Sequence, residues 1–425
     1  MGRFRTLLVT AAAVACPILA QGGGEAGNAI RAAAEISAGK PLVFSASRFV
    51  AKEDTAGADP QNAETRENEA QGIEGFQTGE AAYEPFFCET AEPNGSSAET
   101  AEPLFETAET LELPADRSGY EGEQRTVIES TAEGVPAGTL ISRNIFEFTE
   151  EPAEEDGQGG RIERVHYGNS LADDHITLSG GAQVRNLTQI SSRELSEAAE
   201  QLPEIKPELG SDEPQVLIIH THTTESYEPV SSDEYSSSRT CRTRDSTRNM
   251  VAIGETLGRE LAARGITVLH DGTIHDYPAY SGAYDRSEDT IRAALAEYPS
   301  IKIIIDLHRD AIENSDGTRI APVTEIDGKS AAQFMIITGC DDGRFGNMPD
   351  YMENFKLACL IQNCAEELYP GLARPVLFDY RNYNQHLSTG SLLIEVGGHA
   401  NSFDEAEYTG RLLGEIIAAA AAKLS

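Results

Sequence analysis

The chain has 425 residues, with 33 Lys and Arg against 70 Asp and Glu, which gives a formal net charge of −37. This length is more than one compact core usually holds, so we expect two or three units. Nucleic-acid binding needs clustered Lys and Arg, and an excess of acid repels the phosphate backbone. The composition therefore argues against nucleic acid as a partner.

The N-terminus has the pattern of an export signal. Residues 1–5 hold two arginines, and residues 6–20 form an uncharged run. A basic segment followed by an apolar one of this length is typical of a secretory signal. The run is shorter than the roughly 20 apolar residues of a full membrane span. We expect residues 1–24 to be a signal peptide or a membrane anchor, and the protein to be exported.

Residues 25–135 are expected to be a disordered acidic linker. Residues 53–156 hold 27 acids and 4 bases, a net charge of −23, whereas residues 211–425 hold 33 acids and 18 bases, a net charge of −15. The tetrapeptide ETAE recurs at residues 89–92, 99–102 and 106–109. Such a tract buries too little apolar surface to offset its conformational entropy, and its like charges keep it extended.

Residues 136–202 are expected to form a small β-rich subdomain. Residues 139–148 and 175–187 alternate in the manner of short strands. We interpret residues 151–160 as a loop and residues 203–214 as a second linker.

Residues 211–425 alternate between apolar strands and amphipathic helices. The run at 301–307 (IKIIIDL) is nearly all apolar, which is typical of a strand buried on both faces of a parallel sheet. The pattern predicts an α/β domain with a mainly parallel sheet flanked by helices. We expect strands at 216–219, 266–269, 301–307, 320–325, 333–338, 376–378 and 391–396, and helices over 247–264, 287–298, 351–368 and 403–424.

Histidines and carboxylates follow three of these strands. His220 and His222 come after the first, His308 follows the third, and Glu395 ends the apolar run of the last. Ligands of open α/β sheets bind at the carboxyl ends of the strands, where these side chains converge. Histidines and carboxylates placed together in this way suit zinc. Catalytic zinc sites use three protein ligands and leave one position for water. A nearby carboxylate then accepts the proton of that water. Glu225 is either a further member of the site or a capping residue.

Five segments of this domain occur in a recognisable order. They are VLIIHTHTTESY (216–227), DSTRNMVAIGETL (245–257), HDGTIHDYPAYSGAYDRS (270–287), IIIDLHRDA (303–311) and LLIEVGGHAN (392–401). Together they resemble the stage II sporulation protein P family of exported cell-wall amidases of endospore-forming bacteria. The resemblance covers half of the chain. The acidic tract has no counterpart in the family.

The resemblance implies the fold of zinc-dependent N-acetylmuramoyl-L-alanine amidases, in which two histidines and one carboxylate hold the metal. His222 matches the first ligand and His308 the last, with His220 as the alternative to His222. The middle carboxylate of those amidases lies four residues before an Asn, which selects Asp245 here, with Glu225 as its alternative. This sequence has Asp where the wider group commonly has Glu. Glu395 matches the catalytic glutamate.

The implied reaction is hydrolysis of the amide between the muramyl lactyl group and L-alanine of peptidoglycan. Glu395 would accept and return the proton, and Arg309 would steady an anionic stem peptide or the oxyanion, or act as a structural ion-pair partner. The resemblance also implies an endopeptidase activity, and engulfment partners that comprise a glycan-cleaving protein and a membrane scaffold. The alternatives are a non-catalytic wall-binding scaffold and another zinc amidohydrolase. If that amidohydrolase were a TIM barrel, it would need about 250 residues, which is more than the segment 211–425 contains.

Overall fold

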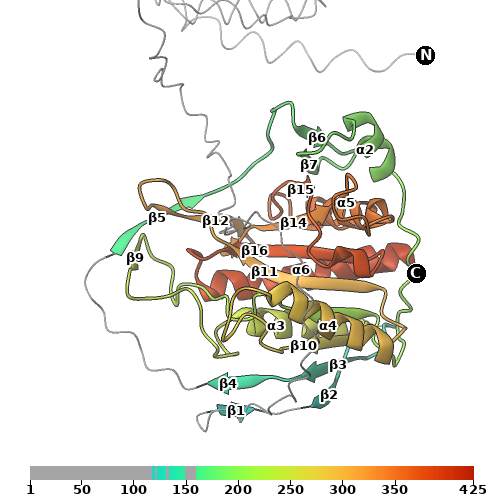
Figure 1. The fold of residues 1–425 in the computed structure, drawn as a ribbon, viewed down its shortest axis with the longest axis horizontal. Coiled ribbons are helices and arrows are strands. Elements are labelled where there is room, and N and C mark those ends of the chain that lie inside the picture. Colours follow the sequence, from blue (N-terminus) through green and yellow to red (C-terminus); the bar gives the residue numbers. More distant parts are fainter. Residues whose placement is uncertain (1–116, 120–121, 131–133, 149–158) are drawn as a thin grey trace, which may run out of the picture. The chain divides into compact units, whose positions relative to one another are not determined.

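A computed structural model describes residues 117–119, 122–130, 134–148 and 159–425 (Figure 1). The predicted export signal and most of the predicted acidic linker lie outside the described residues. Within the described part of the chain, no helix combines the length and the hydropathy that a membrane crossing needs.

A ten-stranded sheet forms the centre of the fold (Figure 1). Six of its nine neighbouring strand pairs are parallel, and the pairs β2–β3, β16–β14 and β7–β6 are antiparallel. This confirms the predicted α/β fold with a mainly parallel sheet. In spatial order the strands are β2 (Glu123–Ile128), β3 (Gly138–Arg143), β10 (Val268–Asp271), β8 (Val216–Ile219), β11 (Ile303–Asp310), β16 (Ser391–Gly398), β14 (Phe334–Gly339), β15 (Val376–Asp379), β7 (Gln183–Asn186) and β6 (His175–Thr177).

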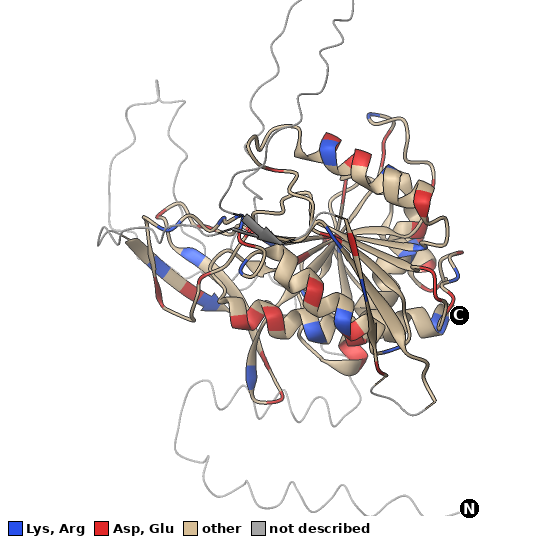
Figure 2. Ribbon diagram, turned by 90° about the horizontal axis from the view of Figure 1, so that it is seen from below, with Lys and Arg blue, Asp and Glu red and all other residues tan. Residues whose placement is uncertain are grey.

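Helices cover both faces of this sheet. The larger core cluster joins one face to α3 (Met250–Ala262), α5 (Tyr351–Leu368) and α6 (Phe403–Leu424), and it also takes in Leu195 of α2 (Ser192–Ala199). A second cluster joins the other face to α4 (Ala283–Glu297). Figure 2 shows that most Asp and Glu lie on helices and loops, and few on strands. A charged residue inside this sheet is therefore an exception that calls for a reason.

The alternation of side chains along β11 places the site residues on one face. Ile303, Ile305 and Leu307 belong to the larger cluster, whereas Ile304 packs with α4. Because successive side chains of a strand point to opposite faces, Asp306 and His308 lie on the same face as Ile304. All eight residues of β11 are buried.

The remaining strands form two smaller sheets. A four-stranded sheet has the order β13 (Lys329–Ala332), β12 (Arg319–Ile326), β5 (Gly159–Val165) and β9 (Glu234–Ser236), and β1 (Arg117–Gly119) pairs with β4 (Phe146–Phe148). Strands from the predicted subdomain at 136–202 are distributed among these sheets. β3, β6 and β7 join the ten-stranded sheet, and β5 pairs with β12. These residues therefore share their sheets with strands from beyond residue 211.

Candidate active site

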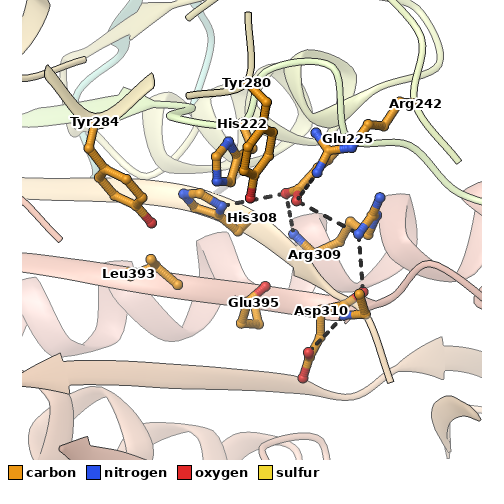
Figure 3. A pocket seen from close by; sticks show the side chains of 11 residues that line it. His222, Glu225, Arg242, Tyr280, Tyr284, His308, Arg309, Asp310, Leu393 and Glu395 are labelled. Carbon is orange, nitrogen blue, oxygen red and sulfur yellow. Dashed lines mark hydrogen bonds and ion pairs between the residues drawn. The ribbon is translucent and has the colours of Figure 1, made fainter. Parts of the chain in front are cut away.

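One pocket lies where β8, β11 and β16 end (Figure 3). His222 and Glu225 lie in the turn after β8, His308 lies in β11, and Glu395 lies opposite His308 in the neighbouring strand β16. The parallel register of β8, β11 and β16 brings these three segments to one edge of the sheet, as predicted. The full lining comprises His222, Glu225, Arg242, Tyr280, Tyr284, His308, Arg309, Asp310, Ala311, Leu393 and Glu395.

His222 is a buried imidazole held mainly by aromatic contacts. Its ring stacks on Tyr280 with 4.4 Å between centroids and meets the ring of His308 edge-on at 5.3 Å. Its Nδ1 is buried and makes no hydrogen bond with any residue that the structure describes. Burial lowers the pKa of His222 to about 4, so the ring is neutral at pH 7. A neutral imidazole with an unengaged nitrogen is the form that binds metals.

Glu225 is a buried carboxylate surrounded by cationic groups and N–H donors. Its Oε2 accepts a hydrogen bond from the backbone N–H of Arg309 at 3.3 Å and lies 3.4 Å from His308 Nδ1. Arg242 Nη2 donates to its Oε1, also at 3.3 Å. Burial alone would raise the pKa of Glu225, but Arg309 and His308 hold it well below its ordinary value. The group is therefore an anion at neutral pH.

His308 lies between two carboxylates. Its Nδ1 faces Glu225, and its Nε2 lies 2.9 Å from Asp306 Oδ1, in a contact that is too bent to be an aligned hydrogen bond. Burial alone would lower the pKa of His308, but Asp306 and Glu225 hold it well above its ordinary value.

Of the carboxylates that line the pocket, Glu395 has the fewest hydrogen bonds to its neighbours. The side chain is buried, and its Oε2 has no hydrogen-bond partner among the described residues. Burial, together with the negative charge of Asp310, raises the pKa of Glu395 to about 8. A carboxylate with a pKa in this range is suited to accept and return a proton near neutral pH.

Arg309 lines the pocket, but its guanidinium is engaged by main-chain carbonyls. Nε donates to the carbonyl of Ser226 at 3.1 Å, and Nη2 donates to that of Cys241 at 2.8 Å. These bonds tie the loop after β8 to β11 and hold Arg309 beside Glu225. This arrangement corresponds to the alternative given for Arg309 from the sequence, a structural ion-pair partner.

Asp245 lies apart from the pocket. Its carboxylate accepts hydrogen bonds from the hydroxyl of Thr247 at 2.7 Å and from Arg248 Nε at 2.8 Å. Asn249 is the N-cap of α3, so Asp245 lies in the loop before that helix. Of the two carboxylates considered as the middle metal ligand, Asp245 and Glu225, only Glu225 therefore lines the pocket.

His220 lies beneath α3 and does not line the pocket. Its Nδ1 donates to the carbonyl of Leu307 at 3.0 Å, and its Nε2 lies 3.0 Å from His270 Nε2. A Cβ added to Gly254 of α3 would approach His220 Nε2 to 2.7 Å, which shows how closely the helix covers this ring. β8 ends at Ile219, so the turn that follows separates two histidines that strand alternation would place on one face.

Polar and aromatic residues of the pocket were not predicted from the sequence, and neither was one carboxylate beside it. Tyr280, Tyr284 and Arg242 belong to loops and to α4, where single polar or aromatic residues carry no clear signal. Asp306 did have a signal, because a carboxylate in the middle of a buried apolar strand must be paired or hydrogen-bonded.

The donor chemistry of the pocket fits zinc. His222, Glu225 and His308 supply two imidazoles and one carboxylate, and within the described ranges the buried His222 Nδ1 has no hydrogen-bond partner. This is a common donor set of catalytic zinc. In the described part of the chain, no three His, Cys, Asp or Glu side chains are already arranged around a metal position. The contact between Glu225 and His308 joins two of these donors directly.

Three solved structures resemble parts of this chain at low scores. They are N-acetylmuramoyl-L-alanine amidase AmiC2 of Nostoc punctiforme (12% identity, TM-score 0.26, 49% of this chain and 95% of that chain), the CwlD amidase from Clostridioides difficile in complex with the GerS lipoprotein (14%, 0.29, 49% and 94%) and a metallo-carboxypeptidase from Burkholderia cenocepacia (9%, 0.28, 72% and 100%). Scores this low assign no reaction to this chain.

The sequence comparisons are more specific. Stage II sporulation protein P of Bacillus subtilis (strain 168) is 31% identical over 231 residues, which are 52% of this chain and 54% of that protein. The chain thus matches about half the length of this curated relative. The family model of Stage II sporulation protein P (SpoIIP) matches residues 143–418, well over half of the chain. The chain therefore belongs to the stage II sporulation protein P family.

Proposed function

We propose that the chain is a zinc-dependent peptidoglycan hydrolase of sporulation, which cleaves the amide between N-acetylmuramic acid and L-alanine. The observation that carries this proposal is the convergence of His222, Glu225, His308 and Glu395 on one pocket in a chain of this family. Glu225 replaces Asp245 as the proposed carboxylate ligand, and His222 is chosen over His220, because only the chosen residues line the pocket.

The metal would be held by His222, Glu225 and His308. A bound zinc ion lowers the pKa of a water molecule toward roughly 7 and polarises the amide carbonyl. Glu395 has the position and the raised pKa to take a proton from the attacking water. The water oxygen bonds to the carbonyl carbon, the C–N bond breaks, and Glu395 returns the proton to the leaving nitrogen.

The arginines of the pocket would act mainly on Glu225. Arg309 presents its backbone N–H and its guanidinium to that carboxylate, and Arg242 contacts the same group from the loop at 239–248. Both arginines favour the ionised form of Glu225, which is the form that binds zinc. We assign Arg309 a positioning role rather than a contact with the substrate.

The N-terminal sequence supports a proposal for the site of action. We propose that the protein is exported and acts on the cell-wall side of the membrane, either cleaved or anchored. An additional endopeptidase activity, and cooperation with a glycan-cleaving protein and a membrane scaffold of engulfment, belong to the same proposal.

Digestion of purified peptidoglycan tests the reaction. The full chain is incubated with and without a zinc chelator, and the products are analysed by mass spectrometry. We expect stem peptides with a free N-terminal L-alanine, lost on chelation and in Glu395→Gln. The control Glu325→Gln alters an exposed carboxylate of β12 and should leave the products unchanged.

Three other outcomes would change the assignment. Products that persist both under chelation and in Glu395→Gln would refute the zinc mechanism. Cleavage only at peptide crosslinks would identify an endopeptidase. Tight binding to peptidoglycan by folded, zinc-loaded protein without any product would favour the wall-binding scaffold.

A further inference from the structure

Asp306 is a buried carboxylate in the middle of the central strand β11. It is 4% exposed, and its neighbours along the strand, Ile305 and Leu307, are fully buried core residues. An ionised carboxylate in such a place costs several kcal/mol unless its oxygens are hydrogen-bonded or paired. The mechanism above does not use Asp306, so its position needs a separate explanation.

Both oxygens of Asp306 are engaged. Oδ1 accepts a hydrogen bond from the backbone N–H of Thr221 at 2.8 Å, and Oδ2 accepts one from the hydroxyl of the same residue at 2.7 Å. The third contact is His308 Nε2, 2.9 Å from Oδ1. Thr221 lies one residue before His222, so Asp306 connects the segments that carry both histidines of the pocket.

Each ring nitrogen of His308 faces a carboxylate, Nε2 towards Asp306 and Nδ1 towards Glu225. An ionised carboxylate only accepts hydrogen bonds, so both nitrogens can carry hydrogen while Glu225 binds no metal. When Nδ1 and Glu225 both serve the proposed metal site, Asp306 is the carboxylate left to accept a hydrogen bond from Nε2–H. The contact to Asp306 is bent, and contacts of this kind often straighten when a ligand binds.

A second layer of hydrogen bonds fixes Thr221 in turn. Its hydroxyl lies 2.7 Å from the hydroxyl of Ser287 in α4, and Asn384 Nδ2 donates to Ser287 at 3.1 Å. The hydroxyl of Thr221 donates to Asp306, and the hydroxyl of Ser287 lies within donating distance of both Thr221 and the carbonyl of Tyr284. The carboxylate is thereby anchored to a helix and to the segment before η1 (Gln385–Leu387).

We propose that Asp306 is the positioning residue of His308, which holds Nε2–H and thereby presents Nδ1 to the metal. The inference rests on the proposed zinc site and adds to it a residue outside the pocket lining. Carboxylates that hold the second nitrogen of a ligating histidine orient the ring, and their loss typically weakens metal binding by about 10- to 100-fold.

Zinc affinity of the full chain tests this role without reference to activity. Zinc alone is titrated against a chromophoric chelator, with wild type, Asp306→Asn and the control Glu255→Gln. Glu255 also contacts a histidine, His270, at 3.4 Å, but it belongs to α3, which packs on the opposite face of the sheet from Asp306. We expect Asp306→Asn to bind zinc about 10- to 100-fold more weakly and Glu255→Gln to bind it as wild type does.

A second pair of variants keeps the test valid if Asp306→Asn fails to fold. Thr221→Val removes the hydroxyl donor to Asp306 and preserves the shape of the side chain, whereas Thr221→Ser retains the donor. We expect weaker zinc binding in the first and near-normal binding in the second. Wild-type affinity in folded Asp306→Asn, or equal affinity in the two Thr221 variants, overturns the inference. Absence of zinc binding by wild type would overturn the proposed function as well.

Discussion

Glu405 connects the start of α6 to three other segments, and its substitution by Gln should destabilise the protein in a pH-dependent way. Its side chain forms a capping box with Ser402, and Oε2 also accepts a hydrogen bond from Asn401 Nδ2 at 3.1 Å. Oε1 accepts from Ser330 Oγ at 2.9 Å and pairs with Arg164. Gln keeps the shape, but its NH₂ group must face donors at one of the two oxygen positions.

The magnitude follows from the burial of this group. Glu405 is 3% exposed, and hydrogen bonds to buried charged groups contribute about 1.5–3 kcal/mol each. Allowing for the bonds that Gln retains, we expect the free energy of unfolding to fall by about 3 kcal/mol at pH 7. Burial alone would raise the pKa of Glu405, but Arg164 and Asn401 lower it below its ordinary value of 4.5. The contribution is therefore complete above pH 4.5 and is lost as the pH falls through the lowered pKa.

Urea unfolding at a series of pH values measures this difference. The control Glu407→Gln changes an exposed carboxylate of the same helix and should alter stability by no more than about 0.5 kcal/mol. Glu405→Gln should be clearly less stable than wild type at pH 7, and the difference should shrink as the pH falls through the lowered pKa of Glu405. A difference that is the same at every pH would refute the electrostatic part of the reasoning, and no difference at pH 7 would refute all of it.

Three further predictions concern α3 and the site. Gly254→Ala should lower stability by about 1–2 kcal/mol, because an added Cβ would lie 2.6 Å from His270 Nε2 and overpacking outweighs the gain of about 1 kcal/mol in helix propensity; a raised melting temperature would contradict this. Glu395→Gln should reduce the rate of peptidoglycan hydrolysis at least about 100-fold with zinc affinity retained, and a matching loss of affinity would indicate a ligand instead. Glu225→Gln should weaken zinc binding at least about tenfold whereas Asp245→Ala should not, and the reverse result in the same titration would restore Asp245 as the ligand.

The elements beyond residue 211 were largely predictable because their signals are local. The bounds predicted for β8, α5 and α6 agree with the structure, since apolar runs and helical periodicity reflect burial of each segment by itself. β5 was missed at the end of an expected loop. Its burial is partial, and its strand conformation depends on pairing with β12, more than 150 residues away. Pairing over such a distance leaves little trace in the sequence around either strand.

The candidate site was predictable as a place and less so in its members. His308 and Glu395 follow apolar runs of buried strands, and the topology brings them together. The choice between His220 and His222 depends on the turn after β8, whose path is set by tertiary contacts such as those of His220 with His270. Asp245 was selected by its distance from Asn249, but that residue caps α3 and does not place Asp245 at the pocket.

The distribution of early strands across the large sheet determines where the chain can be cut. β3 pairs with one edge of β10, and β7 pairs with one edge of β15, although β3 and β7 both precede residue 200 in the sequence. A fragment that starts at residue 205 would leave the N–H and C=O groups along two hydrophobic strands open to pairing with other molecules. It would also remove Leu140, Ile141 and Val184 from the buried core. The smallest fragment that folds and stays soluble should therefore begin before β2, and fragments that begin after β7 should aggregate when expressed.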